Sequence, residues 1–184
     1  MLLATKKTKL KERKMKNRKQ ITLYTTRGAL IAALYVVITE LATLVGLSSG
    51  AIQFRISEAL CILPIFMPEA IPGLFIGCFI SNMLVPQVAI WDIIFGSLAT
   101  LIGAIGARAL MKLPEKFKWV CTIPTILANM IIVPFVLIYA YGAPDSYPFL
   151  MITVGIGEIV CAGIGGSALY YILKKQENQL FNFN

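Results

Sequence analysis

The sequence predicts an all-α integral membrane protein with six transmembrane helices in one bundle. The chain is 58% hydrophobic and only 14% charged, with a mean hydropathy of +0.77. Soluble domains are about 45–50% apolar and about 25% charged. The apolar residues also gather in runs long enough to cross the roughly 30 Å hydrocarbon core of a bilayer.

Six apolar segments give the expected spans. The four long ones cover about 23–47, 92–110, 119–141 and 149–173. Residues 56–87 are too many for one crossing at about 1.5 Å per residue, and the prolines around Glu69 predict a break there. We therefore expect two short spans, about 55–68 and 70–86, joined by a tight turn at MPEAIP. Glu69 is expected to cap the second of them.

The N-terminal segment carries much of the charge. Nine of the 17 Lys and Arg residues lie between Lys6 and Lys19, and an apolar run follows directly. This order favours a basic, disordered cytoplasmic tail over residues 1–21, rather than a nucleic-acid-binding segment or a cleaved signal peptide. The membrane domain is then expected over residues 22–175, followed by a short cytoplasmic tail over residues 176–184.

The distribution of Lys and Arg predicts the orientation. They also concentrate in MKLPEKFK, between spans four and five, and after span six, whereas the segments 47–54, 85–91 and 142–148 contain none. The positive-inside rule places both termini in the cytoplasm and these three loops outside. We therefore expect a multi-pass protein of the cell membrane.

Carboxylates interrupt the apolar runs. In this topology Glu40, Glu58, Asp92 and Glu158 lie in the outer half of the membrane, together with Arg55. A carboxylate in hydrocarbon costs about 2.5–3.5 kcal/mol on insertion scales, and such residues mark functional sites by default. Four acids and one base predict a negative, outward-facing pocket. Either some of the acids are protonated or the ligand is cationic or rich in N–H donors.

Further candidates for this pocket are Arg55, Gln53, Asn82, Trp91 and Asn129. Arg55 and Glu58 share one helix face, so they pair with each other, contact the ligand or order the outer loop over the pocket. Asn82 and Asn129 either join helices through hydrogen bonds or bind the ligand. Trp91 either belongs to an interfacial aromatic belt or stacks on a flat ligand.

Several chemistries find no support in the sequence. The chain has no phosphate-binding loop and no hydrolase or metalloprotease motif, so it is not expected to be an enzyme or to hydrolyse ATP itself. It contains no histidine, and its four cysteines fall inside apolar runs without a C-x-x-C pair. We expect buried cysteines and neither a metal site nor a cofactor.

The stretch GAIQFRISEALCILPIFMPEAIPGLFIGCFISNML, followed by WDIIFGSLATLIGA, resembles the QueT family over roughly residues 25–175. These proteins are substrate-binding components (S-components) of energy-coupling factor (ECF) transporters. The resemblance implies uptake of a queuosine precursor, a 7-deazaguanine such as 7-aminomethyl-7-deazaguanine, or queuine. It also implies a membrane scaffold subunit and two cytoplasmic ATPase subunits as partners, with Ala29 and Ala33 docking on the scaffold.

A 7-deazaguanine would suit the candidate residues. Its N1–H and 2-amino donors can bond to one carboxylate, that of Glu158 or Asp92. Its ring can stack on Trp91, and the amide of Asn82 or Asn129 can bond to its ring carbonyl. A cationic aminomethyl group would suit the surplus of acids.

Two alternatives stay open. The chain could be an S-component for another vitamin-like solute. It could instead be a proton-coupled secondary transporter working alone, although no inverted repeat is evident between residues 23–86 and 92–173.

Overall fold

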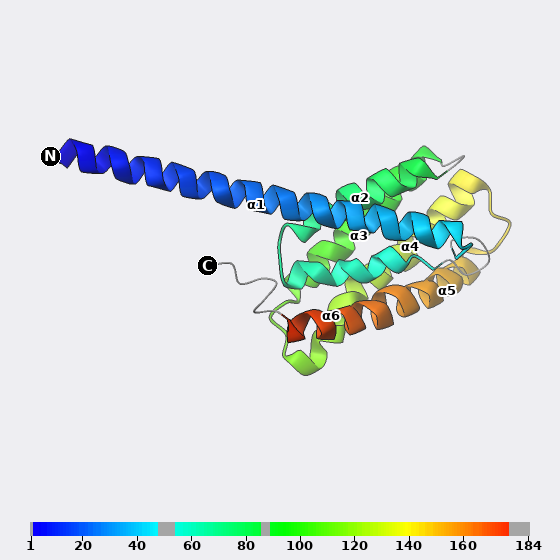
Figure 1. Cartoon of the computed structure of the whole chain (residues 1–184). Coiled ribbons are helices and arrows are strands. Elements are labelled where there is room, and N and C mark those ends of the chain that lie inside the picture. The colour runs from blue at the N-terminus through cyan, green and yellow to red at the C-terminus, as the bar shows by residue number, and fades with distance from the viewer. Residues whose placement is uncertain (1, 48–53, 86–88, 177–184) are drawn as a thin grey trace.

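A computed structural model describes residues 2–47, 54–85 and 89–176 of the chain. Every regular element in these ranges is a helix, and the helices pack into one bundle (Figure 1). In chain order they are α1 (Leu2–Leu44), η1 (Ile56–Ile65), α2 (Ala70–Leu84), α3 (Ile90–Ala109), η2 (Glu115–Thr122), α4 (Ile123–Tyr141), α5 (Tyr147–Glu158), η3 (Ile159–Gly165) and α6 (Gly166–Lys175). The predicted all-α class is confirmed.

The six expected spans correspond to α1, η1, α2, α3, η2 continued by α4, and α5 continued by η3 and α6. Four segments are long and apolar enough to cross a membrane: Asn17–Leu44, Ile90–Ala109, Glu115–Tyr141 and Tyr147–Lys175. The apolar helices Ile56–Ile65 and Ala70–Leu84 are shorter. Two short apolar helices separated near Glu69 are therefore present, as predicted for this region.

The second span is a 3₁₀-helix, which the sequence did not predict. A 3₁₀-helix rises about 2.0 Å per residue, so the 10 residues of η1 extend roughly 20 Å, about a third farther than an α-helix of equal length. Its last carbonyl groups, on Pro64 and Ile65, accept hydrogen bonds from Arg108 Nη1 of α3 at 2.8 and 3.2 Å. Residues 60–64 are all buried, so η1 lies inside the bundle.

The basic N-terminal segment differs from its prediction. We expect disorder over residues 1–21, whereas α1 runs without a break from Leu2 to Leu44. Lys, Arg, Glu, Met and Leu all favour helices, the first glycine is Gly28, and the first proline is Pro64, so nothing in this stretch breaks a helix. The first part of α1 projects beyond the bundle (Figure 1).

Helices α1 and α2 pack closely. A Cβ atom on Gly73 would lie 2.5 Å from the carbonyl oxygen of Gly28, so the two backbones approach where no side chain intervenes. Beside this contact, Arg27 of α1 pairs with the Glu69 carboxylate at 3.1 Å. Glu69 holds the N-cap position of α2, as predicted, but its side chain makes no capping hydrogen bond and binds Arg27 instead.

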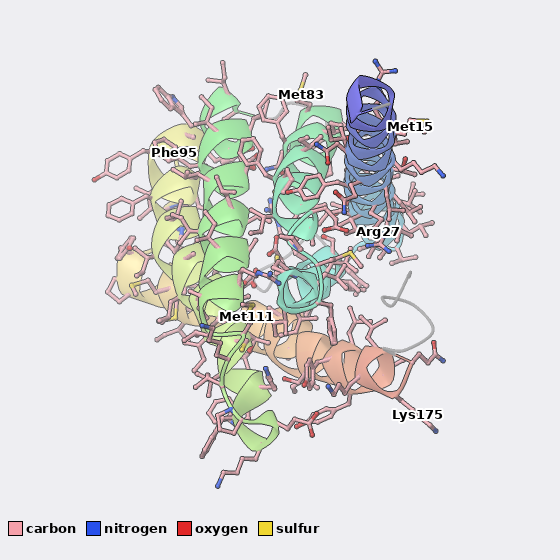
Figure 2. The ribbon with its side chains drawn as sticks, turned by 90° about the vertical axis from the view of Figure 1, so that its left-hand side faces the viewer. Met15, Arg27, Met83, Phe95, Met111 and Lys175 are labelled. Atoms are coloured by element: carbon pink, nitrogen blue, oxygen red, sulfur yellow. The ribbon has the colours of Figure 1, made fainter. Side chains whose placement is uncertain are left out.

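The bundle has two distinct ends. The start of α1, the helix η2 and the end of α6 lie at one end, and the start of α5 lies at the other (Figure 1). We call the first the basic end, because it carries Lys112, Lys116, Lys118, Lys174 and Lys175. The basic end faces the viewer in Figure 2, where Met111 and Lys175 are labelled on it, and η2 and α6 are in contact there.

Small and apolar residues of the helices form the core. Its main cluster includes Tyr35 of α1, Leu60 of η1, and Leu74 and Cys78 of α2. All four cysteines are buried, as predicted, and none forms a disulfide.

Candidate functional site

Glu58 forms the centre of a buried hydrogen-bond network. The hydroxyl groups of Tyr35 on α1 and Thr100 on α3 donate to its Oε1 atom, the second at 3.0 Å. Cys61 Sγ lies 3.1 Å from Oε2. Glu58 is fully buried, and each of these partners presents a donor, so the protein itself satisfies both carboxylate oxygens. The network joins α1, η1 and α3.

A second polar group lies where η1 and α3 begin. Arg55 Nη2 lies 3.4 Å from Asn82 Oδ1 and 4.0 Å from Asp92 Oδ1. Asn82 Nδ2 donates to the Asp92 carbonyl oxygen at 3.2 Å, and the Tyr141 hydroxyl donates to Asp92 Oδ2 at 3.0 Å. A Cβ atom on Gly96 would lie 2.8 Å from Asn82 Nδ2, so a glycine is needed there. These residues join η1, α2, α3 and α4 by mutual contacts.

Glu158 differs from both groups because one of its carboxyl oxygens lacks a partner in the part of the chain that the structure describes. It ends α5 directly before the π-helical segment η3 and is only 5% exposed. Its Oε2 atom is buried and has no hydrogen-bond partner among the described residues. A buried polar group without a partner costs about 1–3 kcal/mol, and more if it is charged. π-Helical turns are frequent at functional sites.

The amide of Asn129, on α4, is also unsatisfied. Asn129 is completely buried, and in the described part of the chain neither its Nδ2 nor its Oδ1 has a partner. It lies near enough to interact with Glu158, but the two side chains do not meet the geometry of a hydrogen bond. Thr125, one helical turn before Asn129, is a third residue with a buried polar atom that lacks a partner in that part of the chain, but its Oγ1 lies against Gly103 of α3. Glu158 and Asn129 thus offer a carboxyl group and an amide to a polar ligand.

Acidic side chains outnumber basic ones around Glu158. Glu58 and Arg55 both lie within electrostatic range of its carboxyl group. Asp92 adds a third acid, next to Arg55. Three acids and one arginine favour a ligand that is cationic or presents N–H donors.

The family of the chain follows from comparison with known proteins. Residues 25–175 match the family described as QueT transporter. The chain belongs to the QueT transporter family. One curated relative, the queuosine precursor transporter QueT of Lactococcus lactis subsp. cremoris (strain MG1363), is 38% identical over 92 residues. The match covers 50% of this chain and 53% of that protein, about half the length of each. No solved structure matches.

Membership in the QueT transporter family agrees with the fold. A transporter family and helices long and apolar enough to cross a bilayer together indicate a multi-pass membrane protein. The family match covers all six spans from residue 25 onward.

Most of the substrate-site candidates come together in this QueT family member. The residues that meet are Arg55, Glu58, Asn82, Asp92, Asn129 and Glu158, which we call the polar cluster. Cys78 links its parts, since Thr100 Oγ1 and Asn82 Nδ2 lie 3.3 and 3.6 Å from Cys78 Sγ. The predicted pairing of Arg55 with Glu58 does not occur, because Arg55 contacts Asp92 and Glu58 is held by Tyr35 and Thr100.

Two candidates lie elsewhere, and the position of a third is not described. Trp91 is 55% exposed and stacks on Phe95 at 6.0 Å between ring centroids, in an apolar groove of about 420 Å³ that Phe135 also lines. Glu40 is half-buried on α1. Its Oε1 atom has no hydrogen-bond partner in the described ranges, so this atom does not bond to the polar cluster there. Gln53 lies outside the described residues.

The sequence analysis did not predict a role for four residues that carry hydroxyl groups. Tyr35, Thr100, Thr125 and Tyr141 each stand alone among apolar residues, where a hydroxyl is compatible with an ordinary core position. Their role depends on which helices become neighbours. Tyr35 and Thr100 lie 23 and 42 residues from Glu58, whose carboxylate they share.

Proposed function

We propose that this chain is the membrane S-component of an ECF transporter that imports a queuosine precursor, a 7-deazaguanine such as 7-aminomethyl-7-deazaguanine, or queuine. Its family membership and the name of its curated relative support this function. A scaffold subunit and two ATPase subunits would supply the energy.

The buried polar atoms of Glu158 and Asn129 that lack a hydrogen-bond partner among the described residues support this proposal most directly. Glu58, Asn82 and Asp92 already have protein partners, whereas Glu158 Oε2 and the Asn129 amide have none within residues 2–47, 54–85 and 89–176. A 7-deazaguanine presents N1–H and 2-amino donors on one edge, next to a carbonyl oxygen. Glu158 accepts from the donors and Asn129 Nδ2 donates to the carbonyl, because a carboxylate and an amide are complementary to these groups.

Access is proposed from outside the cell. The basic end carries the lysines of the α3–η2 connection and of α6. Following the positive-inside rule, we propose that this end faces the cytoplasm from the plasma membrane. Arg55, Asn82 and Asp92 lie toward the opposite end, near the starts of η1 and α3 and the end of α2. The substrate would enter from that side.

Ligand identity and energy source test the proposal together. Mass spectrometry of small molecules extracted from the purified chain should find a 7-deazaguanine. Uptake of that compound into liposomes should require the scaffold, the ATPase subunits and ATP. An unrelated vitamin-like ligand would instead identify an S-component for another solute. Uptake by the chain alone, driven by a proton gradient, would identify a secondary transporter.

The proposed docking face for the scaffold lies between α1 and α2. Ala29 and Ala33 are exposed there on a groove of about 680 Å³, whose α2 side includes Pro72 and Ile76. Small residues let helices approach closely in a membrane, where packing rather than water drives association. We propose that one helix of a partner subunit packs in this groove.

Filling this groove should uncouple transport from substrate binding. In the Ala29→Leu/Ala33→Leu variant the added side chains occupy the space for the partner helix. We expect at least a tenfold loss of copurified scaffold and of ATP-dependent uptake, with substrate affinity within about twofold of the parent. Ala168→Leu, an exposed alanine on α6 outside this groove, is the control and should assemble normally. Normal assembly of the double variant would contradict the docking assignment.

A further inference from the structure

A second pocket lies at the basic end, apart from the polar cluster. It has a volume of about 380 Å³ and is formed by the end of η1, the α3–η2 connection, η2 and α6. Phe66 and Leu113 give it an apolar wall, and Lys112, Lys118 and Lys174 line it with ammonium groups. The acid in its lining is Glu115.

The charge of this pocket favours an anion. Lys118 is 9% exposed, and its ammonium group donates to the Met111 carbonyl oxygen, which fixes it beside the pocket. Lys174 contacts Glu115 at 3.5 Å, but their side chains are 43% and 66% exposed, and ion pairs this exposed contribute little. Lys112 is exposed. Among the described residues that line the pocket, three ammonium groups therefore accompany one carboxylate.

The neighbouring aromatic residues place the pocket at the membrane surface. On η2, Phe117 and Trp119 are 44% and 51% exposed, and the Lys116 ammonium lies 5.0 Å from the Phe117 ring centroid. Exposed aromatic rings among lysines are typical of the level of lipid headgroups, where the rings contact the acyl boundary and the charges remain in water. Since η2 also supplies Lys118 and Glu115 to the pocket, the pocket opens at that level.

We propose that this pocket binds the phosphate of an anionic phospholipid headgroup. Lys112, Lys118 and Lys174 contact the phosphate, and the wall of Phe66 and Leu113 packs against the glycerol and the first acyl carbons. Basic pockets near helix ends on the cytoplasmic side suit anionic lipids in this way. The site is independent of the substrate and would anchor η2 and α6 to the inner leaflet.

Quenching of Trp119 by brominated lipids tests the proposal. The chain has two tryptophans, so Trp91→Phe leaves Trp119 as the reporter. This parent is reconstituted in vesicles that contain brominated phosphatidylglycerol or brominated phosphatidylcholine. We expect brominated phosphatidylglycerol to quench Trp119 severalfold more strongly than brominated phosphatidylcholine does. Each lysine contributes at most roughly fivefold to such a lipid preference, so Lys112→Gln/Lys174→Gln should be quenched nearly equally by the two lipids.

A charge-matched control separates the pocket from the general surface potential. Lys116→Gln/Lys175→Gln removes the same charge from the same end, but neither residue lines the pocket, so the preference should stay. Equal quenching by both lipids in the parent, or an equal loss in both double variants, would overturn the site. Displacement of phosphatidylglycerol by inorganic phosphate, but not by sodium chloride of equal ionic strength, would show a site for free phosphate and overturn the lipid assignment.

Discussion

Replacing Glu158 with glutamine should reduce affinity for a 7-deazaguanine by at least about 100-fold while leaving the fold intact. The substitution exchanges a carboxyl group for an amide whose NH₂ group can face the donors of the ligand. A site built to bond a particular polar group discriminates by factors of this size or more, because its buried groups are otherwise left unpaired. Glu158 Oε2 has no partner among the described residues, so few intramolecular contacts are lost. Equilibrium binding to the detergent-solubilised variant measures the effect.

Two measurements distinguish loss of recognition from loss of structure. The melting temperature of Glu158→Gln should stay within a few degrees of the parent. Asp145→Asn, which removes an exposed carboxylate from the α4–α5 loop, should bind the ligand within about twofold of the parent. Parent-like affinity in Glu158→Gln would remove Glu158 from the substrate site. A large fall in its melting temperature would show that the carboxylate has a structural role instead.

The architecture could be predicted because its signals are local. Hydropathy and length give the long spans, and the prolines around Glu69 give the break between the short ones. The helical type of η1 could not be predicted in this way. It depends on burial among other helices and on Arg108, more than 40 residues away, which binds the carbonyl groups at its end.

Trp91 shows the limit of reasoning from neighbouring positions. It adjoins Asp92 in the sequence, and adjacency alone would lead one to expect both side chains at one ligand. On a helix, consecutive residues point about 100° apart. Asp92 therefore turns toward Arg55 and Tyr141, while Trp91 turns toward Phe95 and an apolar groove.

The acids could be found from the sequence, but their different roles could not. Glu58 and Glu158 both interrupt apolar runs and look equivalent there. In the bundle, Glu58 receives donors from α1 and α3, whereas Glu158 Oε2 has no donor among the described residues. This difference arises only from contacts between residues far apart in the chain. We therefore propose that Glu58 stabilises the fold and that Glu158 recognises the substrate.

Replacing Glu58 with alanine should therefore be among the most destabilising single changes in the chain. Its removal leaves the buried hydroxyl groups of Tyr35 and Thr100 without their acceptor and opens a space where α1, η1 and α3 meet. A buried hydroxyl group left without its acceptor costs about 1–3 kcal/mol, so two of them cost about 2–6 kcal/mol. On the scaling for soluble proteins of this size, that corresponds to a melting temperature lower by roughly 10 °C. Thermal unfolding in detergent measures it.

The hydrogen bonds of Glu58 can be separated from the packing of its side chain by a double-mutant cycle. Tyr35→Phe removes one donor and keeps the ring, so it should cost only about 1–2 kcal/mol. In the Tyr35→Phe/Glu58→Ala variant one stranded hydroxyl group is gone, so the combined loss should be smaller than the sum of the single losses. Glu115→Ala, at an exposed acid in a surface ion pair, should change stability by no more than about 0.5 kcal/mol. Additive losses in the cycle, or a Glu58→Ala variant as stable as Glu115→Ala, would contradict a structural role for this carboxylate.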